Sequence, residues 1–190
     1  MGVIRTFIAI KSPVQVRDRL GKLVNTMRSR WPERSVRWVA PENLHLTLRF
    51  LGNTAETQIA ALSQGLETIA AGYQAFTLTL GKSGTFPGGR RAKVIWTGLT
   101  DKRGSLGELQ QKVEALVQQL GWEPEERVFR PHLTLGRVRQ GIRAPTEIWL
   151  EHPPPVEFEV QEIELVSSHL KPGEAEYRTL CRAALSRAAV

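Results

Sequence analysis

One tetrapeptide that occurs twice carries the residues best suited to chemistry. The sequence HLTL is found at residues 45–48 and again at residues 132–135. Each copy alternates polar and apolar residues, which is typical of a half-buried strand. On such a strand the polar side chains point to one face and the leucines to the other. The polar residues are His45 and Thr47 in the first copy and His132 and Thr134 in the second.

Two imidazoles that share a site can perform acid–base chemistry. A neutral histidine can accept a proton from a nucleophile while a protonated partner donates one to a leaving group. Threonine hydroxyls two residues further on can hydrogen-bond the non-bridging oxygens of a phosphate. One such pair alone is usually the solvated face of a sheet, but packing gives no reason for the same histidine twice. The pattern favours phosphoryl transfer at a diester.

Strand alternation predicts that two arginines point to the same face as the histidine and threonine of their motif. Arg49 lies two residues after Thr47. Arg130 lies two residues before His132, and shares its face if the strand runs unbroken through Pro131. A guanidinium at either position could hold a phosphate through two hydrogen bonds. Each arginine also fits an ordinary surface cation.

A metal site is the main chemical alternative. Zinc needs three or four ligands, and neither motif comes with a cysteine pair, an H-E-x-x-H sequence or a neighbouring carboxylate. His152, in a proline-rich stretch, and His169, in a predicted turn, fit solvent-exposed positions. We expect an enzyme that uses no metal and no cofactor.

Hydrophobic periodicity predicts an α+β protein around the motifs. Amphipathic helices are expected over Pro13–Arg30, Thr54–Ala71 and Ser105–Leu120. The expected strands are Val3–Ile10, Val36–Ala40, Leu44–Leu51, Phe76–Leu80, Val94–Leu99, Phe129–Val138, Val156–Ser167 and Glu176–Leu185, with a turn at residues 171–173. The stretch GKSGTFPGGRRAK at residues 81–93 lacks the order of a P-loop. It fits a phosphate-contacting lid and an ordinary solvated hairpin equally well.

The chain contains an internal repeat. The two motif histidines lie 87 positions apart, and the same shift places Phe7 onto Val94 and the first helix onto a span that overlaps the third. Each half then consists of a strand, a helix and a motif strand. A pseudo-two-fold arrangement would bring the motif strands together in a central cleft. We expect a single domain, residues 1–190, made of two such lobes.

Charge and composition limit the kinds of binding partner and the cellular compartment that fit this chain. The net charge is +7 and the pI about 10.1, which favours a polyanionic partner such as nucleic acid. No apolar run reaches 18 residues, so we expect no membrane span. The single cysteine, Cys181, excludes an internal disulfide and fits a reducing cytosol. We expect a cytoplasmic monomer.

The motifs and their flanks resemble the 2H phosphoesterase superfamily. The flanks are RTFIAI near the start, NLHLTLRFLG, FRPHLTLGR, and the sequence SHLKPGEAEY of Ser168–Tyr177. Together they are similar to the bacterial and archaeal RNA 2′,3′-cyclic phosphodiesterases, also called 2′-5′ RNA ligase-like or LigT/ThpR proteins.

This resemblance implies a bilobal fold with two antiparallel β-sheets flanking a central cleft and helices outside. It implies metal-free hydrolysis of an RNA 2′,3′-cyclic phosphate end to a 2′-phosphate. It makes His45 the proton donor and His132 the proton acceptor, although the nearly identical motifs leave these roles open from the residues alone. It has Thr47 and Thr134 hold the phosphate oxygens.

The roles of two aromatic residues stay open, and so do alternative functions. Phe7 or Trp38 could stack on the terminal base, and both also fit core positions. The same site could act on other cyclic phosphates or form a 2′-5′ RNA linkage. A function of another class is a basic RNA-binding protein with a vestigial site.

Overall fold

The structure, a computed structural model, describes residues 2–140, 142, 152–170 and 175–187. Its strands and helices, in chain order, are β1 (Val3–Lys11), α1 (Val14–Arg30), β2 (Val36–Trp38), β3 (His45–Ala55), α2 (Ile59–Ala71), β4 (Phe76–Phe86), β5 (Val94–Thr100), α3 (Ser105–Gln119), β6 (His132–Val138), β7 (Glu157–Val160), β8 (Glu162–Leu170) and β9 (Ala175–Ala184). Short 3-10 helices lie at Pro41–Asn43, Glu56–Gln58 and Gly89–Arg91.

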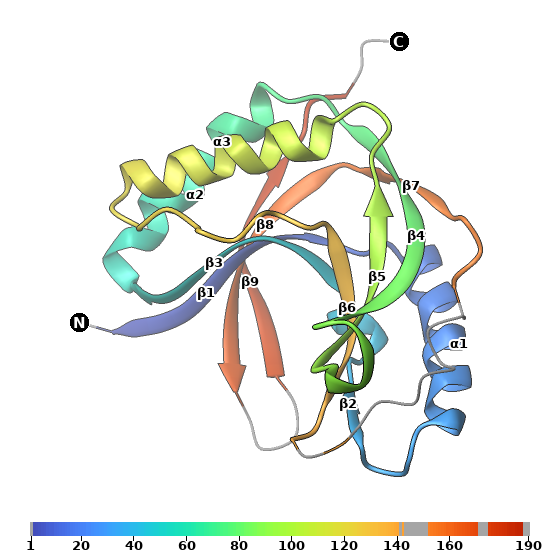
Figure 1. Ribbon diagram of the computed structural model, residues 1–190. Coiled ribbons are helices and arrows are strands. Elements are labelled where there is room, and N and C mark those ends of the chain that lie inside the picture. Colours follow the sequence, from blue (N-terminus) through green and yellow to red (C-terminus); the bar gives the residue numbers. More distant parts are fainter. Residues whose placement is uncertain (1, 141, 143–151, 171–174, 188–190) are drawn as a thin grey trace.

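The strands form two antiparallel halves that meet at one point. One half has the order β9-β8-β1-β3, and the other has β6-β5-β4-β7 with β2 also paired to β6. The halves are joined where Leu46 of β3 pairs with Leu133 of β6. The expected α+β class with two antiparallel sheets is confirmed, with the addition that this pair joins them into one curled sheet (Figure 1).

Strand pairing repeats at the shift of 87 residues. β1 pairs with β3 as β5 pairs with β6, so the same chain segment recurs in each half. The matching pairs are Ile8 with Arg49 and Ile95 with Gly136, Ala9 with Thr47 and Trp96 with Thr134, and Lys11 with His45 and Gly98 with His132. The internal repeat found in the sequence is therefore a repeat of hydrogen-bonding register.

Each motif strand contains a β-bulge at the last residue of its HLTL sequence. Leu48 is the extra residue in β3, because Ala9 pairs with Thr47 and Ile8 with Arg49. Leu135 is the extra residue in β6 for the same reason. A bulge shifts the alternation of side chains by one position. Residues after the bulge therefore point to the face opposite to the one that simple alternation predicts.

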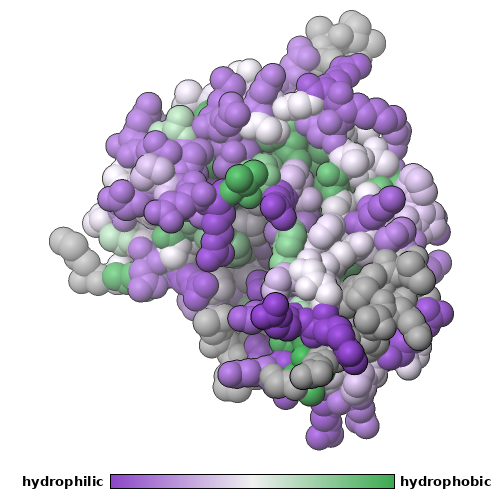
Figure 2. All heavy atoms as spheres, in the orientation of Figure 1, coloured by the Kyte–Doolittle hydropathy of each residue, from purple (hydrophilic) through white to green (hydrophobic). Residues whose placement is uncertain are grey.

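Helices cover the outer face of the curled sheet. α2 and α3 lie together over one half, while α1 lies beside β4 and β5 of the other (Figure 1). The apolar stripes of the helices are fully buried, as at Leu20, Leu66 and Val113, and share one core with the outward leucines of the motifs. On the inner face a small second cluster is formed by Phe7, Ala9 and Val166. Figure 2 shows that this face is hollowed in its middle.

Several predicted boundaries were wrong. The helix expected from Thr54 begins at Ile59, because Thr54 is buried in β3, where its hydroxyl pairs with that of Thr6 at 2.7 Å. The strand expected at residues 156–167 is two strands, β7 and β8, which join opposite halves of the sheet. Residues 81–86 continue β4 in a hairpin with β5, and the predicted turn at residues 171–173 lies outside the described residues.

Candidate active site

The junction of the two halves brings the motif side chains together. β3 and β6 run antiparallel, and Leu46 pairs with Leu133. This register sets His45 across from Thr134 and Thr47 across from His132. The leucines are buried in the core, so the histidines and threonines lie on the inner face. The structure thus places all four motif residues that the sequence predicted around one point.

Both imidazoles are held in the same way. Nδ1 of His45 lies 2.7 Å from the carbonyl oxygen of Asn43, and Nδ1 of His132 lies 2.7 Å from that of Arg130. A carbonyl oxygen only accepts hydrogen bonds, so each Nδ1 carries the hydrogen. Each Nε2 is then the nitrogen left to exchange a proton with a substrate. Two such nitrogens on adjoining strands can serve as an acid and a base.

Aromatic rings pack against each histidine, and the two sets differ. The rings of Phe7 and Tyr177 have centroids 4.8 and 5.2 Å from His45. On the other half Phe86 lies 5.2 Å from His132 and stacks on Trp96 at 4.8 Å. Apart from Phe7, these aromatics were not predicted to lie at the site: Tyr177 entered only as the end of the Ser168–Tyr177 pattern, and the strands of Phe86 and Trp96 carry no HLTL motif.

Burial and nearby charges set the electrostatics of His45. Burial is the main cause that lowers its pKa from the usual 6.5, and the positive charge of Arg137 and the charge that His132 carries when protonated lower it further. The Asn43 carbonyl and the carboxylate of Glu164 act in the opposite direction. Glu164 is itself buried on β8 and accepts hydrogen bonds from Thr179 and Arg182.

Arg137 is a cation near His45 that the sequence analysis did not predict. Besides acting on His45, its charge lowers the pKa of Tyr177, which burial raises. Arg137 lies three residues after Thr134, an odd spacing that simple alternation assigns to the core face. The bulge at Leu135 reverses that assignment and turns Arg137 to the inner face.

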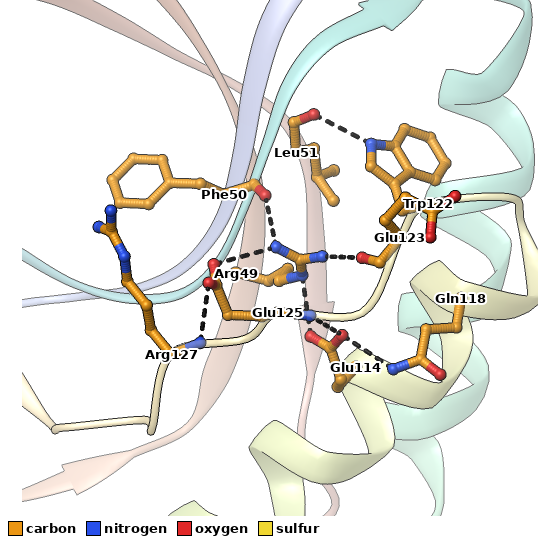
Figure 3. A network of polar contacts seen from close by, with 9 residues as sticks. All are labelled: Arg49, Phe50, Leu51, Glu114, Gln118, Trp122, Glu123, Glu125 and Arg127. Atoms are coloured by element: carbon orange, nitrogen blue, oxygen red, sulfur yellow. Dashed lines mark hydrogen bonds and ion pairs between the residues drawn. The ribbon is translucent and has the colours of Figure 1, made fainter.

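Arg49 was wrongly predicted to share the face of His45. The bulge at Leu48 turns its side chain outward, where it is 9% exposed. Its guanidinium forms ion pairs with Glu114 of α3 at 2.8 Å and with Glu125 at 3.2 Å, and also donates to the carbonyl oxygen of Glu123 (Figure 3). Arg49 therefore anchors the chain that leads from α3 to the second motif.

The remaining predicted residues are placed differently from expectation. β6 begins at His132, so the strand does not run through Pro131, and Arg130 is an exposed residue whose carbonyl orients His132. Phe7 is 3% exposed between His45, Phe50 and Tyr177, which leaves no free ring face for a base.

Trp38 is not brought into the site. It packs edge-on against Trp31 and against the main core, on the outer face beside Gly136. His152 and His169 are exposed, and His169 lies in β8 rather than in a turn. Among the described residues, no three His, Cys, Asp or Glu side chains gather as a metal site requires. Within the same residues, no helix has the length and apolar character of a membrane crossing.

Comparisons with known proteins show which fold and family this chain shares. The fold is that of solved phosphoesterases: the crystal structure of E. coli LigT complexed with 3′-AMP superposes with a TM-score of 0.77 at 30% identity, covering 97% of this chain and 99% of that one. A structure titled only as a phosphoesterase gives a TM-score of 0.81 at 30% identity, covering 97% of this chain and 99% of that one. The RNA 2′,3′-cyclic phosphodiesterase of Escherichia coli K12 is 31% identical over 186 residues, or 96% of this chain and 97% of the relative.

The family follows from a match over most of the chain. The model of the 2′-5′ RNA ligase superfamily matches residues 16–172, a span that includes both HLTL motifs. The chain belongs to this superfamily.

We expect Arg49→Met to destabilise the protein without changing its chemistry. The substitution leaves the carboxylate of Glu114, which is 16% exposed, without its partner, and breaking a buried pair in this way costs about 3–5 kcal/mol. Urea denaturation should show the loss, and the double variant with Glu114→Gln should recover part of it. Folded Arg49→Met protein should retain kcat/KM on a cyclic phosphate. A large loss of kcat/KM at unchanged stability would contradict this structural role.

We expect His45 to titrate below pH 6.5 in the ligand-free protein, as NMR of its imidazole would show. The unfolded state then binds more protons than the folded state as the pH falls below 6.5, so unfolding free energy decreases with acidification. His45→Gln should lose less stability between pH 7 and pH 5 than the wild type. The exposed His169→Gln should behave as the wild type. A His45 pKa at or above 6.5 would refute the expectation.

Proposed function

We propose that the protein hydrolyses RNA 2′,3′-cyclic phosphate ends to 2′-phosphates. The observation that carries this proposal is the pair of imidazoles on adjoining strands, each with Nδ1 tied to a carbonyl and Nε2 left for proton transfer. Opening a cyclic phosphodiester needs one group to accept the proton of water and one to protonate the departing oxygen. Two histidines supply both without further groups.

In the proposed reaction Nε2 of His132 takes a proton from water as its oxygen attacks phosphorus. The bond from phosphorus to the 3′ oxygen breaks, and Nε2 of His45 gives that oxygen a proton. The product carries a 2′-phosphate and a 3′-hydroxyl. The hydroxyls of Thr47 and Thr134 donate to the non-bridging oxygens, and Arg137 balances the charge that develops on them.

The surroundings of the histidines support unequal roles. Ala9 pairs with Glu164 in one half, and the equivalent Trp96 pairs with Gly84 in the other. His45 therefore has a buried carboxylate, that of Glu164, two strands away, and the equivalent position in the other half is a glycine. The carboxylate favours the protonated form of His45. The negative charge of a bound cyclic phosphate acts in the same direction and offsets the burial that lowers the pKa of His45 in the free protein.

The relatives support the substrate class. Proteins 28–33% identical from archaea and bacteria bear the name RNA 2′,3′-cyclic phosphodiesterase, including those of Thermotoga maritima and Escherichia coli. The related E. coli LigT has been crystallised with 3′-AMP, a nucleotide with a ribose phosphate. The net charge of +7 fits a polyanionic RNA partner. The proposal includes a cytoplasmic, metal-independent enzyme with an RNA end as its substrate.

A short RNA with a 2′,3′-cyclic phosphate end, incubated with the protein in excess EDTA, should yield a 2′-phosphate. Phosphatase sensitivity and stability to alkali identify the product. His45→Ala and His132→Ala should each lower kcat by about 10²–10⁴-fold, since each removes one proton-transfer group. Activity that needs a divalent metal, or wild-type turnover in both variants, would refute the two-histidine mechanism.

Arg137→Ala should lower kcat/KM by about 10²-fold, because it removes a charged donor aimed at the developing phosphate charge. Arg137→Lys should recover part of the loss. Arg139→Ala is the matched control, an exposed arginine two residues further on, beyond the end of β6. Equal losses in Arg137→Ala and Arg139→Ala would show a general effect of charge and remove Arg137 from the site.

A further inference from the structure

Phe50 occupies the position in β3 that Arg137 occupies in β6. The two residues are related by the 87-residue shift and follow equivalent bulges, which turn both to the inner face. Arg137 is a cation suited to a phosphate, whereas Phe50 is a large apolar side chain that is 50% exposed. A phenylalanine that a bulge holds in solvent beside a cleft offers a ring face to a ligand.

Phe50 lies further from the two histidines than the rings that touch the imidazoles, because it contacts Phe7 and not a histidine. Its ring centroid is 5.8 Å from Phe7, whose ring is 4.8 Å from His45. The Phe50 ring is thus within about 11 Å of His45, with Phe7 between them. Tyr177 and Phe86 contact the imidazoles directly and lie where the terminal nucleotide would be. Phe50 is placed for the next nucleotide.

A cation accompanies this ring. Arg49 donates to the carbonyl oxygen of Phe50 at 3.3 Å and binds the carboxylate of Glu125, which in turn accepts the backbone N–H of Arg127 at 3.2 Å. The exposed Arg127 side chain extends toward the ring of Phe50 (Figure 3). The Arg49 network thereby fixes the segment with Arg127 beside β3. An exposed aromatic ring with a neighbouring cation is the combination that binds single-stranded nucleic acid.

We propose that Phe50 and Arg127 form a subsite for the nucleotide that precedes the terminal cyclic phosphate nucleotide. The base of that nucleotide stacks on Phe50, and the phosphate that links it to the terminal nucleotide lies near Arg127. The proposal rests on the proposed function. It makes the enzyme one that prefers the end of an RNA strand to a free cyclic mononucleotide.

The experiment compares kcat/KM on 2′,3′-cyclic AMP with kcat/KM on an RNA trinucleotide that ends in a 2′,3′-cyclic phosphate. The wild type should prefer the trinucleotide. Phe50→Ala should reduce the ratio of trinucleotide to mononucleotide kcat/KM by roughly 5- to 100-fold, the usual effect of removing one stacked aromatic. Phe50→Trp should keep the ratio, and Val14→Ala, which shortens a side chain that is 60% exposed on α1, should not change it. Circular dichroism checks that each variant is folded.

Salt dependence tests the cation. A contact with one phosphate of a single strand contributes about 0.7 to the slope of log affinity against log salt concentration. Arg127→Ala should lower that slope by about this amount for the trinucleotide and leave it unchanged for 2′,3′-cyclic AMP. An unchanged slope for both substrates would remove Arg127 from the subsite.

The failures are distinguishable. If the wild type hydrolyses both substrates with equal kcat/KM, or if Phe50→Ala lowers both equally, the subsite is refuted while the phosphodiesterase activity stands. If the wild type hydrolyses neither substrate, the proposed function fails and the subsite with it.

Discussion

The pairing of Leu46 with Leu133 is the contact on which the site depends. It is the point where the two halves of the sheet meet, and both leucines are almost fully buried in the core. Because side chains alternate along a strand, burying these leucines directs the neighbouring histidine and threonine of each motif to the opposite, inner face. The same apolar contact that closes the core thus brings two imidazoles to one place. A slip of one residue in this pairing would turn the histidine and threonine of one motif to the face opposite to those of the other.

The internal repeat gives the two halves of the sheet the same strand pairing, but the side chains around His45 differ from those around His132. Both histidines are held by a carbonyl at Nδ1, so both are prepared for proton transfer at Nε2. Around this shared feature the halves diverge. Glu164 of β8 pairs with Ala9, and in the other half the equivalent residue, Gly84 of β4, pairs with Trp96. A Cβ added to Gly84 would be 2.5 Å from the ring of Trp96. Aromatic rings pack against both histidines, but a buried carboxylate lies near His45, where the equivalent position near His132 is a glycine beside Trp96. This difference favours the protonated form of one histidine over that of the other, which a perfect repeat would not do.

Arg49 shows how a cation beside a motif can serve structure rather than substrate. It is buried, it is bound by carboxylates, and it fixes the segment that connects α3 to the second motif strand. Its position two residues after Thr47 gave no sign of this, because the sequence does not show that β3 bulges at Leu48. The same kind of bulge in β6 carries Arg137 to the inner face. The wrong face predicted for Arg49 and the omission of Arg137 have this single physical cause.

The sequence by itself determined the two HLTL strands, the shift that relates the halves, the three helices and the α+β class, because these depend on local alternation, periodicity and repetition. The tertiary structure alone decided which side chains share the inner face with the histidines. Bulges arise from pairing between strands far apart in the chain, as between β5 and β6, and they reverse the alternation on which sequence reasoning depends. The change of partner at Gln161, between β7 and β8, likewise leaves the local pattern of residues intact. Phe7 is buried against His45 and Phe50 is exposed. Contacts between strands across the sheet, which the local sequence does not show, decide this difference.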